Sequence, residues 1–465
     1  MNEQRTRAAV GPTAVILAGL AVTAFLLPLD GVVDLFTVAA VGVGLSLSIA
    51  TGIEAVEGVR SLIRVDILML WALYGLTFLE FLFPQPDVEA LVSAAAATAG
   101  TQAMLLGFAG LAVGRHLIPR IPQVRSELSV QSRHVFSLFL FAAVVGFLHI
   151  LIAVSFDPFE MLRQMSLPRF SQSWGRGKYG DAYSLLYELG MLIYLLPPVG
   201  GLIYARANEY TLIQTIVVAL VLALTFYYAF ASGTRNIIAT YVIAFAGAYF
   251  LTKPRIKIGQ ILLLGVPILA LLLVATTYML EFRGVGLANF SSTERHYDTL
   301  FIDHNMVNLS QLTQVFPESI EFLGFEIPFN ALIKPIPRVL WPGKPEGLSN
   351  SIEAALGAGQ GTTLSCTFVG EAYMAGGFFA ILLASLLFGA AAELWNRVGR
   401  DINSSFAQVL YASGFLCAAM AMRSMLTMVP FMLPSLALWF YGKFGLPRSP
   451  AVNVRRLDQT SVERR

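Results

Sequence analysis

Apolar and polar residues alternate along this chain in long blocks. Apolar stretches of about 20 residues recur throughout the sequence, and a helix of that length crosses the hydrocarbon core of a bilayer. The pattern predicts about twelve such helices, at residues 10–28, 31–50, 65–83, 89–112, 134–155, 183–204, 211–230, 236–252, 259–280, 366–392, 405–422 and 424–442. We therefore expect an all-α polytopic membrane protein that forms one integral membrane domain over residues 1–465.

Two polar segments between these stretches are too long to be simple connectors. The first covers residues 157–181, and the second covers residues 281–365 between the ninth and tenth predicted helices. In the second segment, apolar residues recur at helical spacing at Met306, Leu309, Leu312 and Phe316. This spacing predicts an amphipathic helix that rests on the membrane surface. Five prolines between residues 328 and 345 then exclude a regular helix from that part of the segment.

Composition and charge support a membrane location and suggest an orientation. The chain is 56% hydrophobic and 13% charged, so much of its surface must face lipid. Twenty of the 31 Lys and Arg residues, Arg64 and Arg115 among them, fall in segments on the side of the N-terminus. By the positive-inside rule, the N-terminus and a C-terminal tail at 443–465 are cytoplasmic. Both long polar segments then lie on the opposite face.

Eleven cations remain on that opposite face, and several stand at the ends of predicted helices. Charge at such positions is costly unless an anion is bound, and Arg binds phosphate oxygens in a bidentate way. We predict a pyrophosphate-binding set of Arg235, Arg283, Arg338, Lys344, Arg176 and Lys178. For each cation the alternative is simple solvation or pairing with a carboxylate of the loops.

A proton acceptor is predicted among Asp303, His304 and Glu371. The first two are adjacent, and His titrates near neutral pH, although a surface His is an equally good interpretation. Glu371 falls in the outer turns of a predicted helix, where a carboxylate is expensive. The substrate is further expected to contact Trp341, Tyr373, Arg295, His296 and Arg423. The alternative for Trp341 is a place in the aromatic belt of the membrane interface.

Signatures for cofactors are missing from the sequence. It contains no G-x-x-x-x-G-K-S/T nucleotide motif, and we interpret the glycine pair Gly376-Gly377 as a small-residue contact between helices. No Cys/His/Asp cluster has metal-ligand spacing, apart from a loose alternation of Glu294, His296 and Asp298. We expect no cofactor and no metal, with the energy for any reaction supplied by the substrate.

These motifs resemble those of the Wzy-type polymerases, which join repeat units of O-antigen or exopolysaccharide in lipopolysaccharide and polysaccharide biosynthesis. The resemblance rests on the topology, on Ser232-Gly-Thr-Arg235, on the proline-rich segment 337–345, and on Gly370-Glu-Ala-Tyr373 followed by Gly376-Gly377. The family's pattern of Arg, ten residues and Gly fits Arg169 to Gly180, but no basic residue of the large loop reproduces it.

The resemblance implies a fold like that of C-class glycosyltransferases in the bacterial inner membrane. It implies activity at the periplasmic face on oligosaccharides linked to undecaprenyl pyrophosphate, and a chain-length regulator as a possible protein partner. Membrane lipid is the other expected partner, and nucleic acid is not expected. Pyrophosphate is a good leaving group, so such an enzyme must hold it, exclude water and deprotonate the incoming sugar hydroxyl.

Two rival functions remain. An O-antigen ligase, which passes the glycan to lipid A, shares the topology, and its functional His would correspond to His296 or His304. A transporter or flippase for glycans would need ionisable residues along the centres of its helices. In this sequence we expect the charges to cluster at the outer ends of the helices instead.

Overall fold

The computed structural model describes residues 8–28, 31–56, 58–119, 132–169, 171–174, 186, 188–253, 259, 265, 270, 278–279, 284–290, 302–336, 338, 340–345, 347–358, 364–398 and 405–445, except for the side chains of residues 59, 60, 235, 288, 405 and 444. Within these residues every regular element is a helix. The long ones are α1 (Val10–Leu26), α2 (Val32–Val56), α3 (Val65–Thr77), α5 (Ala94–Gly114), α6 (Ser132–Ala153), α9 (Leu196–Ala205), α10 (Leu212–Ala231), α11 (Arg235–Thr252), α16 (Thr367–Val398), α17 (Ser405–Arg423) and α18 (Met425–Phe440).

Shorter elements connect these helices. They are α4 (Val88–Leu91), α7 (Pro158–Met165), α13 (Asn305–Val315), α14 (Glu326–Ile333) and α15 (Ile352–Ala355), the 3-10 turns η1 (Val59–Ile63), η2 (Leu79–Leu82), η3 (Gly190–Leu195), η4 (Ala207–Glu209) and η5 (Leu287–Asn289), and the π turn η6 (Tyr441–Gly445).

The helical, membrane-type architecture expected from the sequence is confirmed in its coarse form. Seven helices of the described part are long and apolar enough to cross a membrane, and four shorter apolar helices accompany them. Together they fall in eleven of the twelve predicted stretches. The remaining stretch, 259–280, lies almost wholly outside the described residues.

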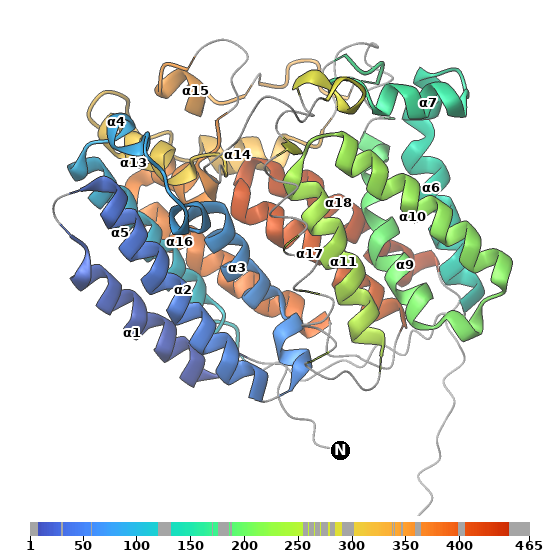
Figure 1. Cartoon of the computed structure of the whole chain (residues 1–465), viewed down its shortest axis with the longest axis horizontal. Coiled ribbons are helices and arrows are strands. Elements are labelled where there is room, and N and C mark those ends of the chain that lie inside the picture. The colour runs from blue at the N-terminus through green and yellow to red at the C-terminus, as the bar shows by residue number, and fades with distance from the viewer. Residues whose placement is uncertain are drawn as a thin grey trace, which may run out of the picture.

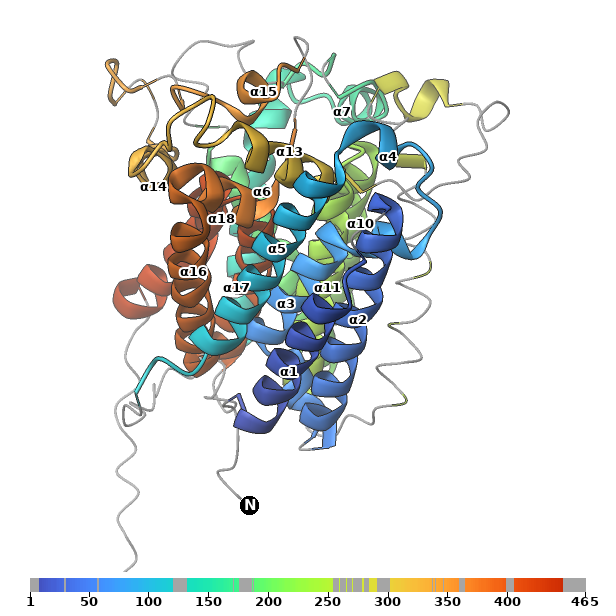
Figure 2. The same cartoon turned by 90° about the vertical axis from the view of Figure 1, so that its left-hand side faces the viewer.

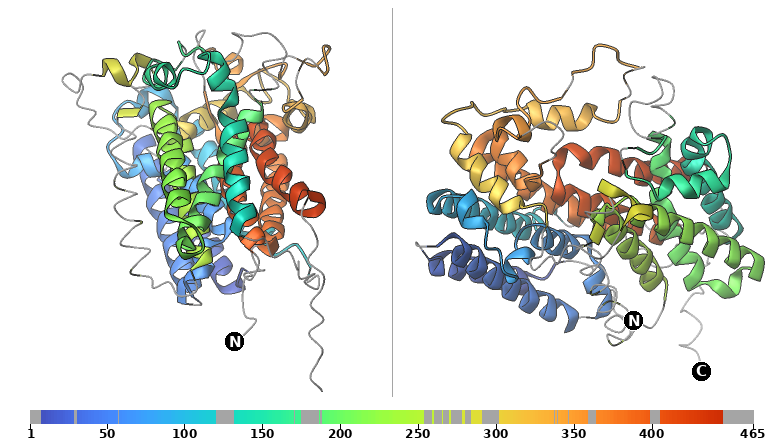
Figure 3. Two further views of the ribbon diagram at one scale, coloured as in Figure 1. Left: turned by 90° about the vertical axis from the view of Figure 1, so that its right-hand side faces the viewer. Right: turned by 45° about the horizontal axis from the view of Figure 1, so that its top comes forward.

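The long helices stand side by side, and α7, α13, α14 and α15 gather at one end of the bundle (Figures 1 and 2). We call this end the upper end and the opposite end the lower end. One core is built on α1, α2, α3, α5, α13 and α16, and a second on α6, η3, α9, α10 and α11. Helix α17 contributes side chains to both cores and lies between them, as the oblique view in Figure 3 shows.

The amphipathic helix predicted around Met306 is present as α13, but its surroundings differ from the expectation. Met306, Leu309 and Leu312 are fully buried, and so is the polar Ser310 on another face of the helix. The helix packs against α5 and α16, where a Cβ added to Gly100 would lie 2.3 Å from the Ser310 hydroxyl. Helix α13 is therefore part of the core that also contains α5 and α16, instead of a helix on the membrane surface.

Two expectations based on glycine and proline are wrong. Helix α14 continues to Ile333 although it contains Pro328, because proline in a first turn removes an N–H that has no partner there. The pair Gly376-Gly377 breaks α16, with φ/ψ of 177°/37° and 64°/−149°. The N–H groups of Leu323 and Gly324 donate to the carbonyls of Met374 and Ala375 at 2.8 and 3.0 Å, which satisfies acceptors that the break leaves open.

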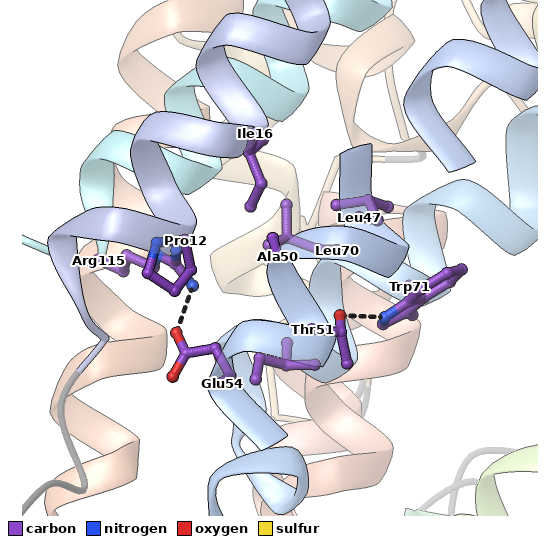
Figure 4. A pocket seen from close by; sticks show the side chains of 10 residues that line it. Pro12, Ile16, Leu47, Ala50, Thr51, Glu54, Leu70, Trp71 and Arg115 are labelled. Carbon is purple, nitrogen blue, oxygen red and sulfur yellow. Dashed lines mark hydrogen bonds and ion pairs between the residues drawn. The ribbon is translucent and has the colours of Figure 1, made fainter. Parts of the chain in front are cut away.

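A buried ionic network joins the helices at the lower end. Arg64 binds Glu54 at 3.0 Å and Asp66 at 2.6 Å, and Arg115 binds Asp66 at 3.0 Å. Figure 4 shows Arg115 pointing toward Glu54, at a distance of 3.7 Å. Arg115 also donates to the Thr13 hydroxyl. Arg64 and Arg115 are thus buried partners of carboxylates, whereas the sequence analysis counted them only among the cations of the segments on the side of the N-terminus.

Side chains distant in sequence complete the network. The Nδ2 of Asn396 in α16 donates to Asp66 at 2.7 Å, and its Oδ1 accepts from the backbone N–H of Val65. The Tyr411 hydroxyl of α17 lies 2.8 Å from the same Oδ1. Charged side chains are therefore buried at the lower ends of the helices, in addition to those at the upper ends.

Candidate functional site

Glu371 lies in the short first part of the broken helix α16, before Gly376-Gly377, and is 3% exposed. One carboxylate oxygen accepts a hydrogen bond from the Ser424 hydroxyl at 2.5 Å. The other accepts from the backbone N–H groups of Met425 and Leu426, the first two residues of α18. The carboxylate thus caps α18 where the helix dipole and the open N–H groups favour negative charge. Among the described residues, the hydrogen bonds to the Glu371 carboxylate thus come from the bend between α17 and α18.

The residue before this bend, Arg423, ends α17 and reaches Asp303. Its Nη2 lies 3.3 Å from Asp303 Oδ2, and the two side chains are 28% and 25% exposed. The Nε of Arg423 is buried and has no hydrogen-bond partner in the part of the chain that the structure describes. This guanidinium therefore forms a partly exposed ion pair and keeps one N–H donor without a partner among the described residues.

Asp303 and His304 precede α13 in an unusual backbone conformation. Their φ angles are 60° and 47°, in the left-handed region that residues with a side chain visit less often. The side chain of Asn308 ties the turn to the core by donating to the carbonyls of Asp303 and Ser365. Strained backbone of this kind persists where the surrounding structure over-determines it, and it is common at functional sites.

Burial lowers the pKa of His304 from its ordinary value, although the nearby carboxylates of Asp87 and Asp303 act in the opposite direction. A His with a lowered pKa is neutral at pH 7 and has one ring nitrogen that accepts a proton. The structure therefore brings Asp303, His304 and Arg423 together beside the bend that Glu371 caps. We call these four residues the upper cluster.

Sequence reasoning missed Glu80, which adjoins the upper cluster. Glu80 is 1% exposed and its Oε2 accepts from the backbone N–H of Ile302 at 2.6 Å. Beside it, the Asn305 side chain donates to the carbonyl of Leu76. A carboxylate inside the predicted stretch 65–83 was the available signal, because charge in an apolar helix usually has a specific role.

The two cations of the proline-rich loop bind their own loop. The guanidinium of Arg338 donates to the carbonyls of Lys344 and Pro345, at 2.9 and 3.3 Å. The ammonium of Lys344 donates to the carbonyls of Lys334 and Ile336, both at 2.9 Å. These bonds hold the loop in a defined shape. Lys344 links its own segment to residues 334 and 336, and Arg338 links to residues 344 and 345.

The two aromatic side chains expected to contact the substrate are found in the proline-rich loop and in α16. Trp341 is 36% exposed in the same proline-rich loop. The Tyr373 hydroxyl donates to the carbonyl of Phe316, and its ring packs edge-on against Phe322 and Phe378. Tyr373 therefore fastens the chain after α13 to α16.

Several predicted residues lie outside the described residues: Arg176, Lys178, Arg283, Arg295 and His296. For Arg235 the backbone alone is described, as the first residue of α11. The other end of α11 bonds α17 near its start, through Thr252 and Gln408, so the backbone of Arg235 is at the upper end. Its neighbour Thr234 accepts a hydrogen bond from Arg169 of the first long polar segment, at 2.9 Å.

Comparisons with other proteins add a single match. The profile of a domain of unknown function (DUF8712) matches residues 301–407. This segment contains Asp303, His304 and Glu371 and ends within the first turn of α17. No curated protein and no solved structure matches the chain.

Proposed function

We propose that this protein is a membrane-embedded glycosyltransferase that polymerises lipid-linked oligosaccharide repeat units. The upper cluster carries the proposal: Asp303, in a strained turn next to a His whose pKa is lowered by burial, pairs with an Arg that keeps a buried donor without a partner among the described residues, at one end of a helical bundle. In this proposal the upper end faces the periplasm, both termini are cytoplasmic, and the bundle lies in the bacterial inner membrane.

The chemistry follows from these groups. The hydroxyl of the acceptor sugar loses its proton to the ring nitrogen of His304 as its oxygen forms a bond to the anomeric carbon of the donor sugar. The bond between that carbon and the pyrophosphate oxygen breaks, and the pyrophosphate leaves with the electron pair on its lipid. Arg423 stabilises the charge that develops on this leaving group. No general acid is needed, because the leaving group is a stable anion.

Within this proposal Glu371 has a positioning role. Both of its oxygens already accept hydrogen bonds from the bend between α17 and α18, so they hold Arg423 in place instead of abstracting a proton. Arg235 and Arg283 remain predicted contributors to pyrophosphate binding. Asp303 supports the cluster by pairing with Arg423.

Single variants in a bacterial strain that lacks its own polymerase test the proposal. His304→Ala and Arg423→Ala should each abolish the ladder of polymer lengths, since loss of a general base alone costs about 10²–10⁴-fold in rate. Arg163→Ala is the control, because this exposed upper-end Arg pairs with Glu160 of its own helix. A normal ladder in both cluster variants, at wild-type protein levels, would overturn the proposal.

A ligase that transfers the glycan to lipid A is the second candidate, because the large loop places His304 next to Asp303, which pairs with Arg423. The surface glycan of a deletion strain separates the two. Single repeat units on the cell surface indicate a missing polymerase, and long chains left on the lipid carrier indicate a missing ligase. Loss of all external glycan would instead point to a flippase.

A further inference from the structure

The left-handed turn at residues 303 and 304 is fixed on both sides. Immediately before it, the backbone N–H of Ile302 donates to Glu80 Oε2 at 2.6 Å. Immediately after it, the Asn305 side chain donates to the carbonyl of Leu76 at 2.7 Å. Both acceptors belong to one short stretch of chain, made of the last turn of α3 and the 3-10 turn η2. That stretch therefore sets the position of the turn.

Glu80 is itself held firmly in place. It is 1% exposed, and the side chain of Gln85 donates to its backbone carbonyl at 3.1 Å. The ring of the next residue, Phe81, packs against Phe36 with 4.6 Å between the ring centroids. A carboxylate is costly to bury among such apolar neighbours, so its presence calls for a polar partner. The N–H of Ile302 is such a partner.

The position of the turn also governs the protonation of His304. Burial is the largest influence on the pKa of His304 and lowers it, whereas the carboxylates of Asp87 and Asp303 raise it. Arg423 pairs with Asp303 from the side of α17. A shift of the turn that hydrates the ring would bring this pKa back toward the ordinary value for His.

We propose that Glu80 is a positioning residue for glycosyl transfer, because its hydrogen bond to Ile302 holds the turn that presents His304. This role rests on the proposed function, in which His304 is the base. Glu80 acts through the reach of its side chain and not through its charge, since the group that it binds is a neutral backbone N–H.

Two substitutions separate reach from charge. Glu80→Asp keeps the charge and shortens the side chain by one methylene, whereas Glu80→Gln keeps the length and removes the charge. Glu89→Ala is the control, because Glu89 is an exposed carboxylate in the neighbouring helix α4. The full chain is used for every variant, reconstituted in nanodiscs and checked for folding by its melting temperature.

Hydrogen exchange at the amide of Ile302 measures the bond directly and needs no turnover. Mass spectrometry with residue-level fragmentation should find exchange about fivefold faster in Glu80→Asp, the effect of losing one hydrogen bond. Glu80→Gln and Glu89→Ala should exchange at the wild-type rate. Unchanged exchange in the Asp variant would overturn the inference, because the bond would then not hold the turn.

Rates of transfer from a lipid-linked repeat unit measure the consequence for catalysis. Glu80→Asp should lower kcat by about 100-fold at an unchanged KM, because a misplacement of about 1 Å costs that much. The acid limb of its rate profile should move to higher pH, since a more hydrated His304 regains a higher pKa. Glu80→Gln should keep the wild-type kcat and the wild-type profile.

Asp87→Asn gives a change of opposite sign. Asp87 raises the pKa of His304, so its neutralisation should move the acid limb to lower pH. Exchange at Ile302 should stay at the wild-type rate, because Asp87 acts on His304 through its charge. A variant of Asp87 with the acid limb of Glu80→Asp would contradict the separate roles of the two carboxylates.

The remaining outcomes also decide between the roles. A Gln variant that is as slow as the Asp variant, with wild-type exchange at Ile302, would mean that Glu80 acts through its charge and would overturn the positioning role. Wild-type kcat in an Asp variant with fast exchange would overturn it as well. Absence of transfer in the wild-type protein would refute the polymerase, and the exchange series would still decide whether Glu80 holds the turn.

Discussion

Two ionic clusters, one at each end of the bundle, use the same residue types in different ways. At the lower end, Glu54, Arg64, Asp66 and Arg115 have side chains no more than 4% exposed, and each cation contacts both carboxylates. At the upper end, the Arg423–Asp303 pair is about one quarter exposed and Arg423 keeps a buried donor without a partner in the described part of the chain. The lower network is closed, and the upper cluster is open.

The difference indicates where binding can occur. A buried set of two carboxylates and two guanidinium groups compensates its own charge, so an additional ion would disturb it. An open pair in strained backbone has donors left for a ligand and a conformation that the rest of the structure must hold. We therefore interpret the lower network as a fastening between helices and the upper cluster as the site.

The largest effect is expected from opening the lower network. Arg64→Ala leaves Glu54 and Asp66 without one of their cations, and breaking a buried ion pair costs about 3–5 kcal/mol. The variant should therefore lose most folded protein, as measured by size-exclusion profiles and melting in detergent. Arg163→Ala removes an exposed Arg and should melt like the wild type. If both variants melt at the same temperature, the lower network does not stabilise the contact between the helices.

A smaller loss of stability is expected at Glu371. Glu371→Ala leaves the N–H groups of Met425 and Leu426 and the Ser424 hydroxyl without their acceptor, at about 1–3 kcal/mol for an unsatisfied buried donor. Glu371→Gln keeps one acceptor oxygen and should restore much of the stability and of the polymer yield. If the Gln variant is stable yet as inactive as a His304 variant, Glu371 is a proton acceptor and not a positioning residue.

Little stability should be lost when the open pair is broken. Asp303→Asn removes the charge opposite Arg423, and a partly exposed ion pair contributes about 0–1 kcal/mol. Glycosyl transfer should nevertheless fall, because Arg423 loses the partner that orients it. Melting and polymer length are measured on the same preparations. A variant that is destabilised as strongly as Arg64→Ala would show that the two clusters do not differ in kind.

The pH dependence gives the smallest expected effect. Because the pKa of folded His304 is lowered below that of the unfolded chain, its contribution to stability is present above about pH 6.5 and is lost as the pH falls toward the folded value. The acid limb of the rate profile should likewise lie below pH 6.5. Wild-type and His304→Gln proteins are compared by melting from pH 5 to 8. An acid limb above pH 6.5 would exclude His304 as the base.

Sequence patterns sufficed for the helical elements and for part of the site. Apolar length alone located eleven stretches that are helices, and helical spacing located α13. Polar residues next to apolar stretches pointed to Asp303, His304 and Arg423. Their convergence is a tertiary property, since it depends on a bend at Ser424 and on left-handed residues at 303 and 304 that no periodicity encodes.

The features that the sequence did not predict also have physical causes. Arg64 and Asp66 adjoin the start of an apolar stretch, so they resembled the charged flank of a membrane helix, while their partners Asn396 and Arg115 are far away in sequence. Gly376-Gly377 is compatible both with a helix contact and with a helix break, because glycine permits either. Only the neighbouring loop, which supplies hydrogen bonds at the break, selects the second.

The break at Gly376-Gly377 divides α16 into two helical parts. The first part, residues 367–375, carries Glu371 and is bonded to the loop at Leu323 and Gly324. It lies beside the second part, residues 378–398, because the rings of Phe368 and Phe388 pack at 5.1 Å and a Cβ added to Gly107 of α5 would meet both Val369 and Ser385. Since the ladder of helix hydrogen bonds is interrupted at the break, the two parts can lie side by side, whereas a continuous helix would separate residues 368 and 388 by about 30 Å. The break thereby returns the chain to the interior of the bundle, where the buried Glu371 carboxylate reaches the bend at Ser424.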